Sequence, residues 1–351
     1  MNLLKSFLIP QKKSSHYPSG NYSNRGSFVD FLYQNGHSDL GSWQSVKYYK
    51  QVAPLFTAVN LITEDVRAID PVIWDSVKDQ PVCTHPIQIL FESPNADSTW
   101  QELIQRAASF LLITGNCYLV ALGSVNRPPK EIYVIPSQNV TLQNDSTGAT
   151  EIITVSSGYL NSTFVRKEVN GRFRYYDGAL REIYHIRLFN PGSIGSSNFG
   201  MSPLTPIYPE LEQYISASTH NLSQLKRGAT MSAVISFDDP LSDDDRTRLQ
   251  QQLDQFYSGS QNAGRSMIMD SKANIASMSS SNKDMDFLNL KKSVEHSIYN
   301  ALKVPLALVS ADQMTLSNLE TSVLNLYDNA VLPLAKTLYR ELTLFLMPRY
   351  P

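Results

Sequence analysis

Histidine and cysteine offer the widest range of chemistry in this sequence, but their spacing matches no catalytic or metal-binding pattern. The six histidines are scattered along the chain, at His16, His37, His85, His185, His220 and His296. A zinc site of the HExxH kind needs two histidines four residues apart on one helix, and no such pair occurs. Cys83 and Cys117 fit neither a zinc ribbon nor a redox pair, so we expect both to be packing residues. We therefore expect no metal and no cofactor.

Two further stretches resemble binding loops in composition, and both have a simpler structural interpretation. The segment Gly192–Gly200, GSIGSSNFG, lacks the Gly-Lys-Ser/Thr ending that places a positive charge on phosphates, so we interpret it as a flexible linker. Asp243, Asp244 and Asp245 follow Ser242, and such a run suits a helix N-terminus. An EF-hand would need alternating ligands and a later Glu, which this run lacks.

The sequence nominates no set of catalytic groups. It contains no G-x-S-x-G elbow and no pair of carboxylates that spacing alone identifies as acid and base. We therefore expect that the chain is not an enzyme. Because catalytic groups can converge from distant positions, a hydrolase with a spatially assembled site stays open as an alternative.

Length, charge and hydropathy limit the class of protein. A chain of 351 residues with 42% hydrophobic residues is long enough for roughly two domains with a real core. With 30 basic and 32 acidic residues, the net charge of −2 provides no global attraction to nucleic acid, so any DNA is contacted locally. The N-terminus fails as a signal peptide and no apolar run approaches a membrane span, which predicts a soluble protein of a reducing compartment.

The first half of the chain predicts an α+β domain. Residues 11–45 are rich in Ser, Asn, Gly and Tyr without periodicity, which indicates an extended arm. Helical periodicity runs from Pro54 until Asp70-Pro71, and a second helix follows Ser98 or Thr99 with a capping box. Strands are then expected at Cys117–Leu122, Glu131–Ile135, Glu151–Val155, Phe164–Val169, Arg172–Tyr176 and Ile183–Leu188, with Asn170-Gly171 as a hairpin turn.

The second half predicts two long helices of matching length around a small insert. The first helix, Pro206–Arg227, spans roughly 33 Å and the second, Asp284–Lys303, roughly 30 Å. Between them we expect a strand, a helix and a strand at Ser232–Phe237, Asp243–Tyr257 and Arg265–Asp270. A polar loop, Ser310–Asn318, then leads to a final helix from Leu319 that is kinked at Pro333. Two rods joined by a tip suit a wall in an assembly better than a substrate pocket.

From Gly200 to its end, the sequence resembles the portal proteins of tailed bacteriophages. The resemblance rests on the order and spacing of several motifs: GMSPL at Gly200–Leu204, KRGATMSAVISFDDPLSDDDRTRLQQQLDQFY, SVEHSIYNALKVPLALVS, LSNLETS at Leu316–Ser322 and VLPLAK. Two earlier pieces are similar in kind to that family's opening helices and strand: YYKQVAPLFTAVNLITEDVRAIDP and SPNADSTWQELIQRAASFLLITGNCYLVAL. One departure is Leu302-Lys303, where the family often has an aromatic residue and Gly before Val-Pro.

The resemblance implies an α+β portal fold assembled as a ring. It divides the chain into an N-terminal arm (1–45), an α+β wing (46–200), stem helix 1 (201–227), a clip (228–283), stem helix 2 (284–305), a tunnel loop (306–318) and a short crown helix (319–351). The tunnel loop near the DNA would comprise Ser310, Ala311, Asp312, Gln313, Met314, Thr315, Leu316, Ser317 and Asn318. Val304 and Pro305 would form the junction between stem and tunnel loop.

Five cations on or beside the two stem helices are candidates for the wall of the channel: Lys226, Arg227, Lys291, Lys292 and Lys303. Salt bridges between subunits and solvated faces are alternative interpretations of these residues. Near-neutral composition favours a pore over a clamp, because each strong phosphate contact hinders sliding.

The resemblance also implies partners and a location. It implies a homo-oligomeric ring, normally of twelve subunits, at one capsid vertex of the virion, with assembly in the host cytoplasm. Double-stranded DNA would pass through the channel without sequence specificity during packaging and ejection. The large terminase, a head-tail adaptor, and the major capsid and scaffold proteins would be protein partners, and no membrane is implied. A non-viral oligomeric scaffold with the same helical ring is the other alternative.

Overall fold

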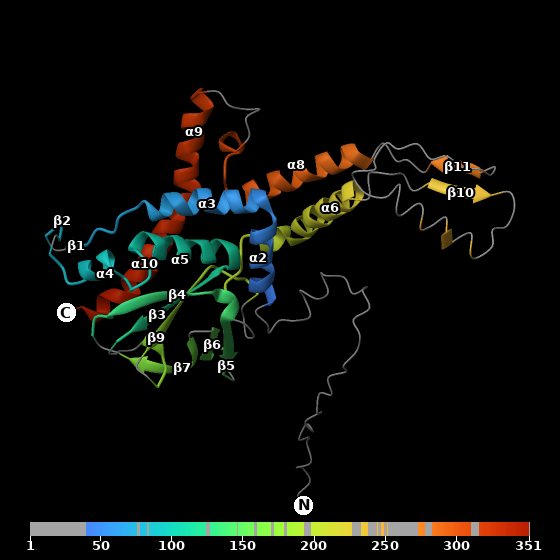
Figure 1. Cartoon of the computed structure of the whole chain (residues 1–351). Coiled ribbons are helices and arrows are strands. Elements are labelled where there is room, and N and C mark those ends of the chain that lie inside the picture. Colours follow the sequence, from blue (N-terminus) through green and yellow to red (C-terminus); the bar gives the residue numbers. More distant parts are fainter. Residues whose placement is uncertain are drawn as a thin grey trace, which may run out of the picture. The chain divides into compact units, whose positions relative to one another are not determined.

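The computed structural model describes most of the chain beyond residue 39 (Figure 1). The described residues are 40–75, 78–82, 84–123, 127–145, 147–157, 160–169, 172–178, 181–192, 198–226, 233–237, 244, 247, 248, 251, 273–277, 283–309 and 316–350. The chain divides into two units, Met1–Gly36 and His37–Pro351, and all described residues belong to the second.

A seven-stranded antiparallel sheet forms the body of the first half, with the order β4-β3-β9-β8-β7-β6-β5. The strands are β3 (Asn116–Leu122), β4 (Glu131–Ile135), β5 (Val140–Asn144), β6 (Thr150–Ser157), β7 (Leu160–Val169), β8 (Arg172–Tyr176) and β9 (Glu182–Arg187). Every strand predicted for the first half of the chain is present. The sequence missed β5, and it placed the start of β7 four residues late, at Phe164. Asn170-Gly171, the predicted turn between β7 and β8, lies outside the described residues.

The inner face of the sheet holds a hydrophobic core to which strands far apart in the order contribute. The core comprises Tyr118, Val120, Ile135, Val140, Ile153, Val155, Phe164 and Ile183, all buried. In β3 the residues of the opposite face are buried as well, because α5 packs there. Burial on both faces explains why β3 reads as a continuous apolar run and not as an alternating one.

Four helices precede the sheet in the chain: α2 (Leu40–Gln51), α3 (Ala53–Arg67), α4 (Gln88–Glu92) and α5 (Trp100–Thr114). Helix α5 packs on β3 and β4, and the other three helices contact α5. The predicted capping box is confirmed at α5, where the Thr99 hydroxyl accepts from the Glu102 amide and the Glu102 carboxylate accepts from the Thr99 amide. Two hairpin strands, β1 (Trp74–Asp75) and β2 (Gln80–Pro81), precede α4. The expected arm over 1–45 is corrected at its end, since α2 begins at Leu40.

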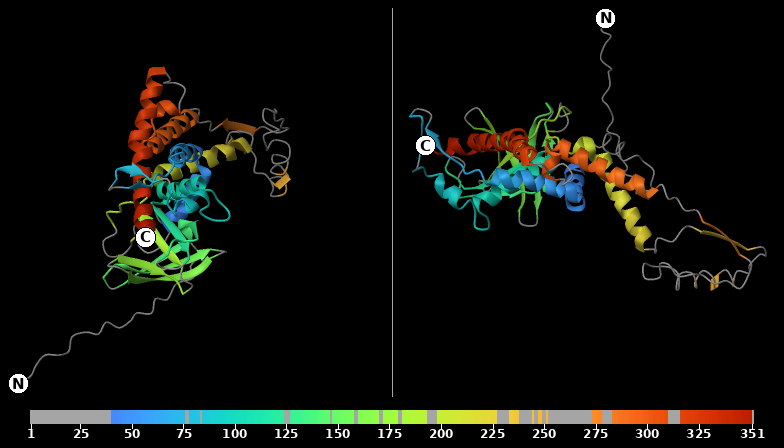
Figure 2. Two further views of the ribbon diagram at one scale, coloured as in Figure 1. Left: turned by 90° about the vertical axis from the view of Figure 1, so that its left-hand side faces the viewer. Right: turned by 90° about the horizontal axis from the view of Figure 1, so that it is seen from above.

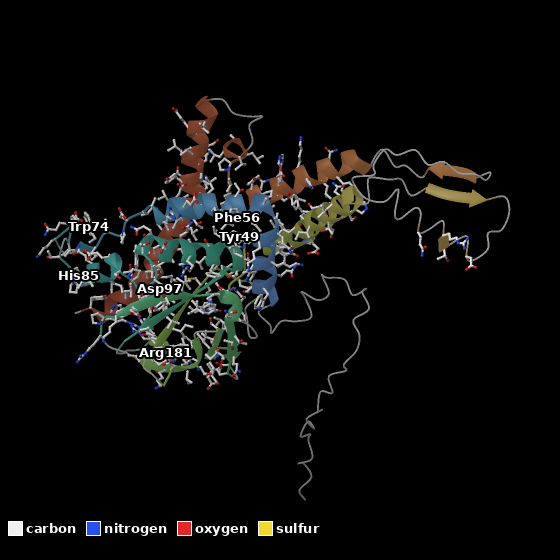
Figure 3. The ribbon with its side chains drawn as sticks, in the orientation of Figure 1. Tyr49, Phe56, Trp74, His85, Asp97 and Arg181 are labelled. Atoms are coloured by element: carbon white, nitrogen blue, oxygen red, sulfur yellow. The ribbon has the colours of Figure 1, made fainter. Side chains whose placement is uncertain are left out.

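Helix α2 turns sharply into α3 at Val52, and Pro54 occupies the first turn of α3, where a missing N–H is harmless. The rings of Tyr49 and Phe56 meet across this corner with centroids 5.3 Å apart (Figure 3). On its other side, α2 holds the start of a later helix, since the Tyr48 ring lies 5.3 Å from that of Tyr208 and the Tyr48 hydroxyl donates to Glu212.

The second half contains the two expected long helices, α6 (Tyr208–Lys226) and α8 (Lys283–Ala301), of 19 residues each. A 3-10 turn, η2 (Thr205–Ile207), precedes α6. Between the helices, β10 (Ala233–Phe237) pairs antiparallel with β11 (Ala273–Ser277). The sequence placed that second strand at Arg265–Asp270, a segment outside the described residues, so the observed partner of β10 lies later in the chain.

The C-terminal part is helical almost throughout. It comprises η4 (Leu306–Leu308), α9 (Leu316–Leu326), a π-helical turn η6 (Tyr327–Val331), α10 (Leu332–Leu346) and η7 (Met347–Arg349). Helix α9 begins at Leu316, three residues before the predicted Leu319. The sequence predicted a kink at Pro333, but Pro333 falls in the first turn of α10, where a proline is tolerated, and the irregular part is the π-helical turn that precedes it.

A buried ion cluster fastens α10 and η7 to the sheet. Glu182 on β9 accepts a hydrogen bond from Arg349 and lies 3.6 Å from the Arg174 guanidinium on β8. Tyr184 donates to Glu341 over 2.7 Å, and the Tyr184 ring stacks on Phe345. Charges this deeply buried require such partners, so the cluster fixes where the C-terminal helix meets the sheet.

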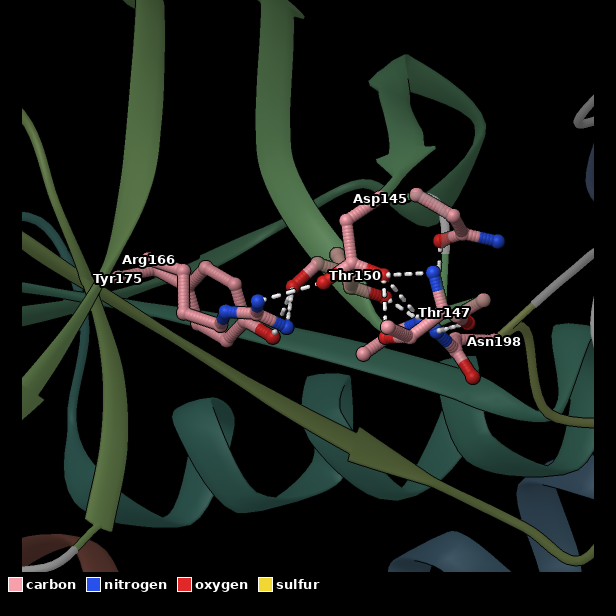
Figure 4. A network of polar contacts seen from close by, with 9 residues as sticks. Asp145, Thr147, Thr150, Arg166, Tyr175 and Asn198 are labelled. Carbon is pink, nitrogen blue, oxygen red and sulfur yellow. Dashed lines mark hydrogen bonds and ion pairs between the residues drawn. The ribbon is translucent and has the colours of Figure 1, made fainter.

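The β5–β6 turn is closed by a polar network around Asp145 (Figure 4). Its carboxylate accepts from the Thr147 hydroxyl over 2.5 Å and pairs with Arg166 on β7 over 2.6 Å. The Thr147 hydroxyl bond and the Arg166 charge hold the pKa of Asp145 well below its usual range. The Asn198 side chain donates to Thr150 over 2.7 Å, so the same turn anchors the chain that leads toward α6.

Candidate functional site: two paired helices and the turn that follows them

The GMSPL motif is the junction between the sheet and α6, and the Asn116 side chain organises it. Asn116 Oδ1 accepts from the Gly200 amide over 2.6 Å, and Asn116 Nδ2 donates to the Gly200 carbonyl over 3.2 Å. Ser202 Oγ donates to the Ile113 carbonyl at the end of α5 over 2.7 Å and accepts from the Leu204 amide over 3.0 Å. The start of α6 is thereby fixed to the end of α5.

The same amide orients His185, which packs half-buried beside it. His185 Nε2 lies 3.0 Å from Asn116 Oδ1, and the imidazole stacks on Tyr118 with centroids 4.3 Å apart. Because that oxygen can only accept, Nε2 carries a proton. Burial, followed by the nearby charge of Arg187, lowers the pKa of His185 to about 3, so the ring is neutral near pH 7. His185 is therefore a structural residue.

Helices α6 and α8 lie side by side and are joined through the segment that contains β10 and β11 (Figures 1 and 2). Their facing sides meet through two ring contacts: the Lys291 ammonium lies 5.5 Å from the Tyr214 ring centroid, and the His220 and Phe287 rings are 5.5 Å apart. At 1.5 Å per residue, each helix is roughly 28 Å long. The prediction of two matched rods is confirmed.

Helix α8 ends in a Schellman motif centred on a lysine. The Val304 amide donates to the Tyr299 carbonyl over 2.8 Å, and the Lys303 amide donates to the Asn300 carbonyl over 3.1 Å. This pattern requires the left-handed conformation at Lys303, whose φ is 59°. Val304 is 3% exposed, and Pro305 follows it and prevents the helix from continuing. The Leu302-Lys303-Val304-Pro305 sequence therefore forms a defined turn that ends α8.

The five predicted wall cations have different surroundings. Lys291 packs over Tyr214, whereas Lys292 and Lys303 are exposed. Lys226 is the last residue of α6, with its side chain outside the described set, and Arg227 is outside it altogether. The structure thus separates Lys291, which faces α6, from Lys292, which faces away from it.

The predicted tunnel loop is described only at its two ends. Leu306–Leu308 form a 3-10 turn after the junction, and Leu316, Ser317 and Asn318 form the first turn of α9 and not a loop. Residues 310–315, which include Asp312, Gln313 and Thr315, lie outside the described residues.

One large cavity could in principle hold a substrate. It has a volume of about 800 Å³ and lies between α5, the β3–β4 edge and the β6 end, with Asp97 and Arg181 on its wall (Figure 3). Its lining is mainly apolar, and among its described lining residues no histidine or cysteine accompanies Ser157. Within the described residues, no cluster of His, Cys, Asp and Glu suited to a metal was found, and no helix has the length and apolar character to cross a membrane.

The protein has an antiparallel sheet with helices packed on one face, followed by two matched helices and a C-terminal helical segment that contains a π-helical turn. These features define a mixed helix-and-sheet class with a long helical pair as its main feature. Residues 53–350 match the phage portal protein family. The chain belongs to this family, since the match covers most of its length. This agrees with the resemblance that the motifs from Gly200 onward indicated.

Curated relatives and solved structures agree with this membership. Uncharacterised proteins of Rickettsia bellii (strain RML369-C) and Rickettsia felis (strain ATCC VR-1525 / URRWXCal2) are 25% and 24% identical, each matching 82% of this chain and 72% of the relative. A chain in the virion of a native gene transfer agent particle is 24% identical with a TM-score of 0.57, over 87% of this chain and 81% of that one.

Two further structures show the same fold. A chain in the neck of the native gene transfer agent particle, computed with C12 symmetry, is 23% identical with a TM-score of 0.56, over 92% of this chain and 85% of that one. The HK97 family phage portal protein of Corynebacterium diphtheriae is 15% identical with a TM-score of 0.56, over 85% and 88% of the two chains. The chain therefore has the portal fold.

Proposed function

We propose that this protein forms a ring-shaped channel at one capsid vertex, through which double-stranded DNA enters during packaging and leaves at ejection. The observation that carries the proposal is the family match over residues 53–350, together with the paired helices α6 and α8. Solved relatives of the same fold include a particle neck with C12 symmetry, which supports a closed ring of identical subunits, normally twelve.

Within that ring, the regions keep the roles that the resemblance implied. Residues 46–200 form the wing, α6 and α8 form the stem, and 228–283 form the clip, which includes β10 and β11. Residues 306–315 form the tunnel loop, and the crown comprises α9 and α10, beginning at Leu316. The Schellman turn at Lys303 and Val304 is the rigid joint from which the tunnel loop departs.

A channel must let DNA slide, and the charge of this chain suits that task. The net charge of −2 provides no general grip on phosphates, and each strong phosphate contact would add to the salt-dependent affinity that opposes movement. DNA contacts are therefore few, weak and independent of sequence. The Asp312, Gln313 and Thr315 side chains of the tunnel loop are candidates for such contacts.

The proposed partners follow from the position at a vertex. The clip docks the large terminase during packaging and a head-tail adaptor afterwards, and the wing contacts the major capsid and scaffold proteins. The protein is then a component of the virion that assembles in the host cytoplasm. Because the family is structural and not catalytic, we propose no enzymatic activity for this chain.

Mass measurement tests the ring directly. A cyclic assembly requires a heterologous interface, in which one face of a subunit meets a different face of its neighbour. Native mass spectrometry or sedimentation of the purified full chain at micromolar concentration should show a closed oligomer of about twelve subunits. A stable monomer under those conditions, or ATP hydrolysis by this chain alone, would contradict the proposal.

A further inference from the structure

The rotation of α8 about its own axis is fixed by what it buries. Val294 is 1% exposed and Ile298 is 0% exposed, and Tyr299 is buried beside them. Lys291 lies on the α6 side, over the Tyr214 ring. These contacts leave one face of α8 turned away from the protein body.

That free face carries hydrogen-bond donors and positive charge. Its exposed residues are Asn289, Lys292, Ser293, His296, Asn300 and, in the turn that follows, Lys303. Positions 292, 296 and 300 are spaced by four residues each, which places them in one row along α8, and Lys303 follows in the turn at the end of the helix. We name this row the α8 donor row.

The nearest carboxylate on the same helix points elsewhere. Glu295 is half-buried, and its charge contributes, after burial, to the raised pKa of the Tyr214 and Tyr299 hydroxyls. Glu295 therefore lies on the Tyr214 side with Lys291, one turn away. Between residues 289 and 303, no exposed position of the described chain is acidic.

The described side chains of α6, at residues 208–223, form no equivalent row. The exposed ones are Pro209, Gln213, Ser216, Thr219, His220 and Leu222, none of which is Lys or Arg. Among the described side chains of the helical pair, the exposed positive charge therefore lies on α8.

Lys303 provides a second, independent observation. A side chain with a Cβ is strained in the left-handed conformation, and glycine is the usual residue at this position of a Schellman motif. A lysine there keeps a positive charge at the end of the donor row despite the strain. Strain that persists at one residue is a reason to look for a function of its side chain.

We infer that the α8 donor row lines the channel and meets the phosphate backbone of duplex DNA. The inference rests on the proposed function and specifies which helix, and which face of it, the DNA passes. Lys292 and Lys303 attract phosphates, whereas His296 and Asn300 offer further hydrogen-bond donors between them. From Lys292 to Lys303 the row extends roughly 17 Å, so one subunit contacts only a short part of the duplex. Contacts to the backbone alone are independent of sequence.

The test compares charge removal on the two sides of α8. Full-length rings carrying Lys292→Gln together with Lys303→Asn are compared with wild-type rings and with Lys291→Gln rings; Asn is chosen at 303 because it tolerates the left-handed conformation. Binding of two blunt duplexes of unrelated sequence is measured from about 50 to 200 mM salt. Native mass spectrometry confirms that each variant assembles.

The expected result is intact rings in all three proteins. The double variant should bind both duplexes about tenfold or more weakly at low salt, with the slope of log K against log salt reduced by at least about 1. Lys291→Gln should match wild type. Unchanged binding by assembled double-variant rings, or no duplex binding by wild-type rings, would overturn the inference while leaving the ring itself in place.

Loss of assembly in the double variant would also overturn the inference, because the row would then be a contact between subunits. Failure of the wild-type protein to form a ring is a different result, since it contradicts the proposed function before any DNA is added.

Discussion

Gly200 packs so closely against Gly115 that a Cβ on Gly200 would stand 2.1 Å from the Gly115 carbonyl oxygen. Gly115 closes α5 in the left-handed conformation, with φ of 76°, and a Cβ there would meet the Met201 backbone at 2.5 Å. The two glycines therefore let the end of α5 and the start of the α6 segment touch through their backbones. This contact sets the position of the helical pair relative to the sheet.

Replacing Gly200 by Ala should destabilise the protein by about 2–3 kcal/mol, because backbone atoms must move to admit the methyl group. Urea unfolding at one fixed protein concentration measures the effect. Gly41→Ala is the matched control, since nothing lies within 4 Å of a Cβ at Gly41 and the residue is in α2. The control should be neutral or stabilising by up to about 1 kcal/mol. Equal stability of Gly200→Ala and wild type would refute the close contact.

Lys303→Gly should stabilise the fold, by about 1 kcal/mol, because glycine removes the strain of the left-handed conformation. The gain is offset in part by loss of a positive charge near the C-terminus of α8. Lys303→Val should do the opposite, because a β-branched residue is least tolerant of a positive φ. In thermal unfolding, Lys303→Gly should have the highest melting temperature, wild type an intermediate one and Lys303→Val the lowest. If Lys303→Val proved as stable as Lys303→Gly, the left-handed turn at residue 303 would be refuted.

Acid should destabilise the protein through His185. The folded pKa of about 3 lies below the unfolded value of about 6.5, so only the unfolded chain takes up a proton between these values. The contribution of the neutral imidazole is therefore present above pH 6.5 and is lost as pH falls toward 3, by about 1.4 kcal/mol per pH unit at most.

The window from pH 6.5 to 5 separates His185 from most carboxylates, which titrate at lower pH. The free energy of unfolding of the wild-type protein should be lower at pH 5 than at pH 6.5. The difference should be smaller for His185→Gln, which has no titrating ring. Identical pH dependence in the two proteins would show that His185 is not buried as a neutral ring.

Deleting Asp312–Thr315 should leave ring assembly intact while reducing DNA packaging or retention, because the proposed tunnel loop contacts DNA and not the stem. Electron microscopy counts rings, and nuclease-protected DNA in particles measures retention. If the particles have a normal DNA content, this segment does not contact DNA in the channel.

Much of the fold could be predicted because local signals agreed with tertiary structure. The Thr99–Glu102 capping box, the apolar run of β3 and the Val304-Pro305 stop each carry their own physical cause in the sequence. Helix α2 could not be predicted from the sequence, because its buried positions include Ser42 and Ser45, which leave no apolar stripe to detect. Polar burial of this kind is visible only once a partner such as Tyr208 is in place.

The candidate site was predicted only in part for a similar reason. The sequence nominated Lys291 and Lys292 together, and only the packing of Tyr214 separates them. Strand β11 carries a single large apolar residue, Ile275, so its pairing opposite Ile235 is decided by register and not by composition. His296 and Asn300 were missed, although their spacing from Lys292 was the signal that could have found them.

In the proposed ring, α6 and α8 of many identical copies surround one opening. End-on electron microscopy of the purified protein, carried to a resolution that shows helices, would reveal this arrangement. We expect a closed ring with a central hole wide enough for a DNA duplex, and with α6 and α8 at the rim of that hole. Particles without a hole, or a ring with this helical pair on its outer edge, would contradict it.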